Sequence, residues 1–191
     1  HVSNLTEHPR VLMGSFDKSF LKIPKEVINS IMKNHQKYFS VYSTSKMSSL
    51  VSKFIFVAGS PYLDNNKVVK GNEKVLAARL NDGKFFYEED IKSGLEKIRD
   101  KIDHITFIEG IGSYGDKARR VGKLALKIRD MLGLNIDVDD IIKTSELCKA
   151  DLASQMVFEF PELQGIMGGY YSHYSLKSVS YTHLRAHETP L

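Results

Sequence analysis

The spacing of apolar residues predicts strands in the first third of the chain. Residues 10–14 (RVLMG) form a short apolar run after Pro9, which predicts a buried strand because the run is too short for a helix. Residues 38–42 and 53–58 alternate in polarity on either side of the Ser- and Thr-rich residues 43–52. This pattern predicts two antiparallel strands joined by a loop.

Three- and four-residue spacing of apolar positions predicts helices elsewhere. Pro24 opens one such pattern, which continues to His35 and indicates an amphipathic helix. A second helix is expected over residues 72–90, with Gly83 as the point where it bends or divides. A third is expected over residues 95–104.

The clearest periodicity runs over residues 113–132, with Gly133 as a stop signal. Its apolar stripe consists of Tyr114, Ala118, Val121, Leu124, Ala125, Ile128 and Leu132. We expect this stripe to be buried, so that Val121 or Leu124 replaced by Ala would cost about 2 to 4 kcal/mol. Asp137 or Asp139 caps a further predicted helix that continues to Met156. Pro161 and the glycines that follow it break the pattern.

These patterns indicate an α+β chain with three parts. Residues 1–66 form an α+β segment with one helix and a hairpin, and residues 67–178 form a mainly α-helical domain. Residues 179–191 show neither the helical nor the strand spacing of apolar residues. They resemble translated vector or adapter sequence, so we interpret them as a non-native tail.

Composition excludes several classes of protein. With 42% hydrophobic and 26% charged residues, the 191-residue chain is typical of a globular protein, and it has no apolar run of the ~20 residues that a membrane span needs. The single cysteine, Cys148, cannot form an internal disulfide, and no signal peptide is evident, so we expect a cytoplasmic protein. The chain starts with His1 and is interpreted as a piece of a longer product.

Three candidate sites have weak support. Gly110, Gly112 and Gly115 satisfy a dinucleotide-binding glycine pattern, but helices follow instead of a strand-helix-strand unit. Asp103 and His104 lack the partner cluster of a catalytic pair. The four-residue spacing of His183 and His187 suits a metal, yet no Glu follows His183 and the segment looks foreign. Cys148 lies among apolar residues and is interpreted as a packing residue. We therefore predict no catalytic residue and no metal ligand.

Basic residues are the more promising feature. The net charge is +4, and cations gather on the polar side of the 113–132 helix: Lys117, Arg119, Arg120, Lys123, Lys127 and Arg129. With Lys70, Lys74 and Arg79 they suit a phosphate-binding surface of low sequence specificity. A solvated charged face is the alternative.

Several ordered segments are unusual enough to be compared with known families. They are PKEVI (24–28), MKNHQKYF (32–39), KGNEKVL (70–76), CKADL (148–152) and QGIMG (164–168), with further residues at Arg79, Leu80, Asp82, Phe85, Phe86, Asp116, Lys117, Met156, Val157, Glu159, Phe160 and Tyr171. Together these segments resemble one family, the beta subunit of bacterial heterotetrameric glycyl-tRNA synthetase. The resemblance covers roughly residues 5–172, and matching all of these blocks by chance is implausible.

The resemblance implies a role in aminoacylation without the chemistry itself. In this family the alpha subunit holds the ATP and glycine site, whereas the beta subunit supplies tRNA-binding surfaces. The implied partners are the alpha subunit and tRNA(Gly), in a heterotetramer of two alpha and two beta subunits, with no membrane partner and no cofactor in this segment. The candidate tRNA-binding residues are Lys70, Asn72, Arg79, Lys117, Arg119, Arg120, Lys123 and Lys149.

The helical region from residue 67 onward also resembles a degenerate His-Asp phosphohydrolase fold. The position that would carry adjacent His and Asp reads Cys148-Lys149-Ala150-Asp151. A protonated lysine is not a metal ligand, and one carboxylate is too few for a hydrolytic site. Two alternatives remain open: a metal-dependent phosphohydrolase that kept its activity, and a purely structural subunit-interface module.

Overall fold

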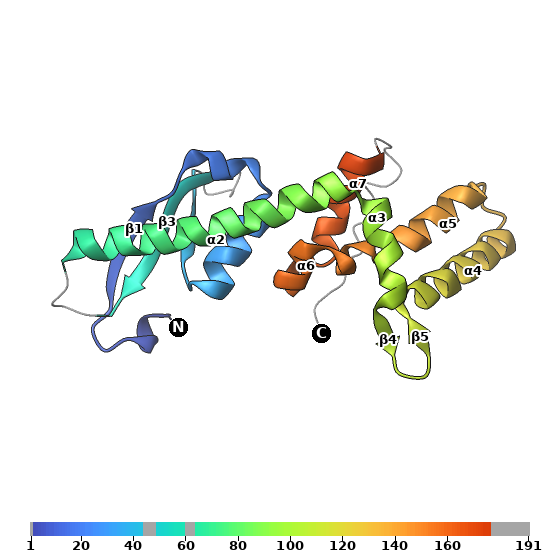
Figure 1. Ribbon diagram of the computed structural model, residues 1–191, viewed down its shortest axis with the longest axis horizontal. Helices are drawn as coiled ribbons and strands as arrows, with labels where there is room; N and C mark the ends of the chain where they lie inside the picture. The colour runs from blue at the N-terminus through green and yellow to red at the C-terminus, as the bar shows by residue number, and fades with distance from the viewer. Residues whose placement is uncertain (1, 44–48, 60–63, 177–191) are drawn as a thin grey trace. The chain divides into compact units, whose positions relative to one another are not determined.

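The computed structural model describes residues 2–43, 49–59 and 64–176 (Figure 1). The predicted tail, with His183 and His187, lies outside these residues. The chain divides into two compact units, residues 1–85 and 86–191. Both units include part of one long helix, α2 (Asn65–Ser93). The change of pattern that we placed at residues 66–67 thus coincides with the start of α2, and the unit boundary lies within this helix.

The first unit contains the predicted strands. β1 (Arg10–Ser15), β2 (Phe39–Tyr42) and β3 (Leu50–Ala58) form an antiparallel sheet in the order β1-β3-β2 (Figure 1). This confirms all three strand predictions and the α+β class. β3 begins at Leu50, within the segment that was expected to be loop, because its pairing with β2 extends to Tyr42.

One face of the sheet carries the core of this unit. Phe54 and Phe56 of β3 are buried there, and the Tyr38 ring stacks on Phe54 with ring centroids 4.8 Å apart. The predicted N-terminal helix is confirmed as α1 (Lys25–Ser30), which continues in a π-helical turn, η3 (Ile31–His35). The apolar side chains at its predicted spacing are fully buried: Val27, Ile28, Ile31 and Met32.

Helix α2 is longer than predicted and does not divide at Gly83. A Cβ atom at Gly83 would lie 2.7 Å from Cδ1 of Ile31, which is itself fully buried. The glycine therefore permits close packing of two elements and does not interrupt the helix. The helix begins at Asn65 rather than residue 72, a start that the polar residues near it did not reveal.

The second unit is mainly helical, with one small hairpin. In chain order after α2 it contains α3 (Leu95–Arg99), η4 (Asp100–His104), β4 (Thr106–Ile108), β5 (Gly112–Ser113), α4 (Tyr114–Leu132), α5 (Val138–Leu147), η5 (Ala150–Ala153), α6 (Gln155–Glu159), η6 (Pro161–Leu163) and α7 (Ile166–Leu176). Two further 3-10 turns, η1 (Val2–Leu5) and η2 (Lys18–Lys22), belong to the first unit. Among the helices of the described ranges, none has an apolar stretch that would reach across a bilayer.

The ends of α4 are where the local sequence places them. The Ser113 side chain accepts a hydrogen bond from the Asp116 backbone amide, and the Asp116 carboxylate accepts one from the Ser113 amide, which is a complete capping box. Gly133 ends the helix in the left-handed conformation, with φ of 61°. The prediction of this helix is confirmed.

The prediction that the next helix continues to Met156 is wrong. α5 begins after Asp137, as expected, but ends at Leu147. A new helix, α6, starts after Ser154, whose hydroxyl accepts a hydrogen bond from the Val157 amide.

Helix α7 was missed because Gly168 and Gly169 were interpreted as breaks. A Cβ atom at Gly168 would lie 3.3 Å from Cγ of Asp151. This glycine therefore lets a buried carboxylate approach the start of a helix, which is a tertiary requirement rather than a turn signal.

Candidate nucleic-acid interface

Helix α4, which carries most of the candidate cations, packs on its neighbours η4 and α5 through its smallest residues. Gly115, Ala118 and Gly122 are buried, and a Cβ atom at Gly122 would lie 3.3 Å from Cβ of Ser145 on α5. The two helices lie side by side in Figure 1. Small residues let the helix backbones approach closely.

The larger aliphatic side chains of the predicted α4 stripe, in contrast, are exposed. Val121, Leu124 and Ile128 retain 43%, 59% and 46% of their accessible surface. Our expectation that Val121 and Leu124 belong to the core is therefore wrong. Periodicity established that a stripe exists, but burial follows a neighbouring side of the helix, which shares only Ala118 with the stripe.

We expect Leu124→Ala to change the free energy of unfolding of this chain by less than about 0.5 kcal/mol, because the side chain is solvated. Leu147→Ala, at a buried position on α5, should cost about 2 to 4 kcal/mol. Denaturant unfolding followed by circular dichroism measures both. A cost at Leu124 as large as that at Leu147 would contradict the exposed assignment.

Arg119 is held by two carboxylates. Its guanidinium donates to Asp103 at 2.9 Å and to Asp116 at 2.8 Å. The Arg119 hydrogen bond is the main cause that lowers the pKa of Asp116 to about 2, followed by hydrogen bonds from Ser113. With its charge largely offset, Arg119 is a weaker candidate for phosphate contact than the sequence indicated.

Lys117 and Lys149 lie in a partly apolar setting. The Lys117 ammonium lies 4.1 Å from the centroid of the Phe107 ring, within the range of a cation–π interaction. Lys149 is half-buried, and desolvation lowers its pKa. The positive charge of nearby Lys117 lowers this pKa as well.

The cations with the freest access to solvent are Arg120, Lys123 and Lys127. All three are exposed on α4, and no carboxylate of the described residues pairs with them. Arg120 makes only a long hydrogen bond, 3.4 Å, to the carbonyl of Ile111. Lys127 belongs to the basic side of this helix, although it is not one of the eight candidate tRNA-binding residues.

The remaining candidates lie in the first unit. Lys70 and Arg79 are exposed on α2. Asn72 is engaged in packing, since its Oδ1 accepts a hydrogen bond from the Tyr38 hydroxyl and its Nδ2 donates to the Val68 carbonyl at 2.8 Å. Asn72 therefore has little capacity left for a ligand.

The glycine pattern at Gly110, Gly112 and Gly115 has a structural explanation. Gly110 and Gly112, with φ of 78° and 115°, lie at the turn and the second strand of the β4–β5 hairpin. Gly115 makes room for Asp103, because a Cβ there would overlap the Asp103 carboxylate. This arrangement differs from the strand-to-helix loop that a dinucleotide site requires.

Asp151, the carboxylate of the segment Cys148-Lys149-Ala150-Asp151, binds backbone amides. It is fully buried, and its Oδ2 accepts hydrogen bonds from Gly165 at 2.6 Å and Gly168 at 3.1 Å at the start of α7. Its Oδ1 has no hydrogen-bond partner among the described residues. Within the described ranges, no three His, Cys, Asp or Glu side chains lie close enough together to hold a metal ion.

The neighbouring Cys148 is half-buried, and its thiol donates to the Ser145 carbonyl at 3.1 Å. Burial raises the pKa of this thiol, which keeps it protonated. Both features suit the packing role that the sequence suggested.

Asp90 is a second buried carboxylate, and sequence reasoning missed it. Oδ1 accepts from the Gln155 amide at 3.0 Å, and Oδ2 accepts from the Met156 amide and the Tyr171 hydroxyl, both at 2.9 Å. Asp90 thereby caps α6 from a position 65 residues away. No local signal could have revealed this role.

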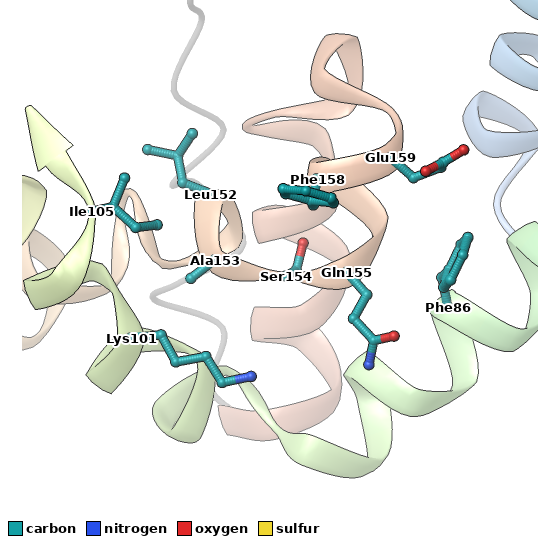
Figure 2. Close-up of a pocket in the computed structure, with 9 residues that line it drawn as sticks. All are labelled: Phe86, Lys101, Ile105, Leu152, Ala153, Ser154, Gln155, Phe158 and Glu159. Carbon is teal, nitrogen blue, oxygen red and sulfur yellow. The ribbon is translucent and has the colours of Figure 1, made fainter.

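The second unit also has an open groove of about 490 Å³ (Figure 2). Phe158 stands at its rim with 85% of its surface exposed, and Figure 2 shows Lys101 and Gln155 reaching into the same opening. The other residues that line it are Phe86, Ile105, Leu152, Ala153, Ser154 and Glu159. None of these residues was predicted as a site residue. The sequence does not show which residues line a groove, nor that Phe158 is exposed.

Comparison with known proteins gives a consistent result. Residues 1–184 match the family model described as glycyl-tRNA synthetase beta subunit. Over 172 residues, 90% of this chain, the sequence is 43% identical to the glycine–tRNA ligase beta subunits of Halalkalibacterium halodurans and Listeria welshimeri. It is 41% identical to that of Rickettsia bellii over 190 residues, 99% of this chain.

The chain spans only about a quarter of each of these relatives: 24%, 25% and 28% of their respective lengths. The match to the Rickettsia bellii protein extends over almost the entire chain and so overlaps residues 179–191. The non-native origin of that tail stays a prediction.

Proposed function

The chain belongs to the glycyl-tRNA synthetase beta-subunit family, and on this premise we propose that it is a tRNA-binding segment of glycine–tRNA ligase. The observation that carries the proposal is the group of exposed cations on α4, Arg120, Lys123 and Lys127, which have no carboxylate partner among the described residues. Such a group suits contact with a phosphate backbone of any sequence.

We further propose that the chemistry of the enzyme occurs elsewhere. ATP and glycine would bind the alpha subunit, and this chain would need no cofactor of its own. The partners would be the alpha subunit and tRNA(Gly), in a cytoplasmic heterotetramer of two alpha and two beta subunits. The engagement of Asp90 and Asp151 in hydrogen bonds to backbone amides supports a segment without a catalytic centre.

The helical region is proposed to be a degenerate His-Asp phosphohydrolase domain. Its succession of helices and the motif Cys148-Lys149-Ala150-Asp151 support this relation. We expect no nucleotide hydrolysis with added divalent cations, because the motif retains a single carboxylate, which cannot assemble a metal site by itself. Hydrolysis that Asp151→Asn abolishes would establish the rival activity instead.

The proposed function predicts the behaviour of a triple variant, Arg120→Gln with Lys123→Gln and Lys127→Gln. In the intact enzyme, its affinity for tRNA should fall about tenfold at moderate salt. The salt dependence should flatten by about one unit per lost phosphate contact. Titration of labelled tRNA at several salt concentrations measures both quantities, and glycine-dependent pyrophosphate exchange should be unchanged.

A matched control removes the same net charge from the first unit. Lys18, Lys22 and Lys25 are exposed there and would be replaced by Gln together. If the two triple variants bind tRNA with equal affinity and equal salt slope, the α4 cations contact only solvent. The purely structural alternative would then be favoured.

A further inference from the structure

Helix α4 carries a row of solvent-exposed apolar side chains. Val121, Leu124, Ile128 and Met131 follow one another at steps of three, four and three residues, and Met131 is 84% exposed. Alternating steps of three and four place side chains along one line of a helix surface. This is the spacing with which a second helix packs in a helix-helix seam.

The contact with α5 leaves this row uncovered. The buried residues of α4 are Gly115, which faces Asp103, Ala118, and Gly122, which faces Ser145 of α5, and the helical period places all three on another side of α4. The connection that follows α4 adds Leu134 and Ile136, which are also exposed. Single exposed apolar residues are ordinary, but a continuous row of them marks an interaction surface.

The charges beside the row argue against a second copy of the chain as the partner. Arg120, Lys123 and Lys127 lie next to it on α4. Two α4 helices paired through their apolar rows would bring these cations near their counterparts, which is unfavourable. A helix from elsewhere in the subunit can cover the row and leave the cations facing outward for RNA.

We propose that the apolar row of α4 is the docking site for an amphipathic helix supplied by the part of the same beta subunit that lies outside this chain. The relatives extend far beyond this chain, because the matched segment spans only 24% to 28% of their length. A covalently linked helix has a high effective concentration, so it outcompetes partners in solution. The inference rests on family membership and not on RNA binding by α4.

Photo-crosslinking within the intact enzyme tests the proposal. p-Benzoylphenylalanine that replaces Leu124 within the full-length beta subunit should cross-link to a helical peptide of the same polypeptide outside this segment. Position 130, on another side of α4 and exposed, provides the control, and its yield should be at least about fivefold lower. Mixing subunits with and without ¹⁵N distinguishes a cross-link within one polypeptide from one between two copies.

Cross-links to the alpha subunit, to a second beta subunit or to tRNA would each overturn the proposal, as would equal yields at positions 124 and 130. A second measurement does not depend on the probe. Leu124→Asp with Ile128→Asp should accelerate proteolysis of the full-length subunit about tenfold, because the charges disrupt the covered seam, whereas Asp130→Ala should leave the rate unchanged. An unchanged rate for the double variant would contradict the docking site. The triple glutamine variant tests RNA binding separately, so the two proposals can fail independently.

Discussion

Replacing Asp90 with Ala is expected to lower the free energy of unfolding of the second unit by about 3 to 5 kcal/mol. The carboxylate is buried and accepts three hydrogen bonds, from the amides of Gln155 and Met156 and from the Tyr171 hydroxyl. Without it, two amides at the start of α6 and one buried hydroxyl lose their acceptor. Buried donors without partners carry the full cost of their desolvation.

Denaturant unfolding monitored by far-ultraviolet circular dichroism measures this loss. Asp90→Asn keeps one acceptor oxygen and should cost less than Asp90→Ala. Asp130→Ala serves as the control for removal of an exposed carboxylate, with an expected change below about 0.5 kcal/mol. A loss of less than about 1 kcal/mol for Asp90→Ala would show that α6 does not depend on this cap.

The second large effect is expected at Asp151. Asp151→Ala removes the acceptor of the Gly165 and Gly168 amides from a fully buried position, and should cost about 2 to 4 kcal/mol. The cost is smaller than at Asp90 because the charged carboxylate is desolvated and its Oδ1 has no partner in the part of the chain that the structure describes. Asp151→Asn keeps one acceptor for these amides and removes the charge, so it should cost less than Asp151→Ala.

The same carboxylate predicts a pH dependence. Burial raises the pKa of Asp151 above its ordinary 3.8, more than the amide hydrogen bonds lower it. The folded state therefore binds this proton more tightly than the unfolded state, and this contribution to stability grows as the pH falls through the folded pKa toward 3.8. The Asp151→Asn variant has no titrating carboxyl at this position and therefore lacks this pH-dependent contribution to stability.

The measurement compares the unfolding free energy of the wild type and Asp151→Asn at pH 7 and pH 5. The unfolding free energy of the wild type, relative to that of Asp151→Asn, should be higher at pH 5 than at pH 7. Other carboxylates, including Asp116 with its lowered pKa, affect both proteins alike and cancel in the comparison. A shift in favour of the variant would mean that the hydrogen bonds to Asp151 outweigh its desolvation.

Signals within one turn of the chain were interpreted correctly. The capping box of Ser113 and Asp116 and the left-handed Gly133 define α4, because each satisfies backbone groups only a few residues away. The strand β1 and the helix after Pro24 followed from apolar spacing in the same way. The ordered motifs also identified the family, which the comparisons confirm.

Errors arose where distant segments determine the local conformation. Gly83 and Gly168 were interpreted as breaks, yet each lies within a helix and leaves room for a side chain of another element, Ile31 and Asp151 respectively. Among the candidate cations, Arg119 differs from Arg120 only through its carboxylate neighbours, one of which is 16 residues away. The sequence contains no direct record of such neighbours.

The sequence by itself therefore determined the family, the positions of the strands and of most helices, and the presence of an apolar stripe and a basic side on α4. These properties depend on residue type and on short spacings. Only the tertiary structure decided that Gly115, Ala118 and Gly122 are buried while Val121 and Leu124 stay exposed, and that Asp90 caps α6. Helical spacing shows which residues share a side of a helix, whereas the contact that buries one side depends on the shape and position of its neighbour.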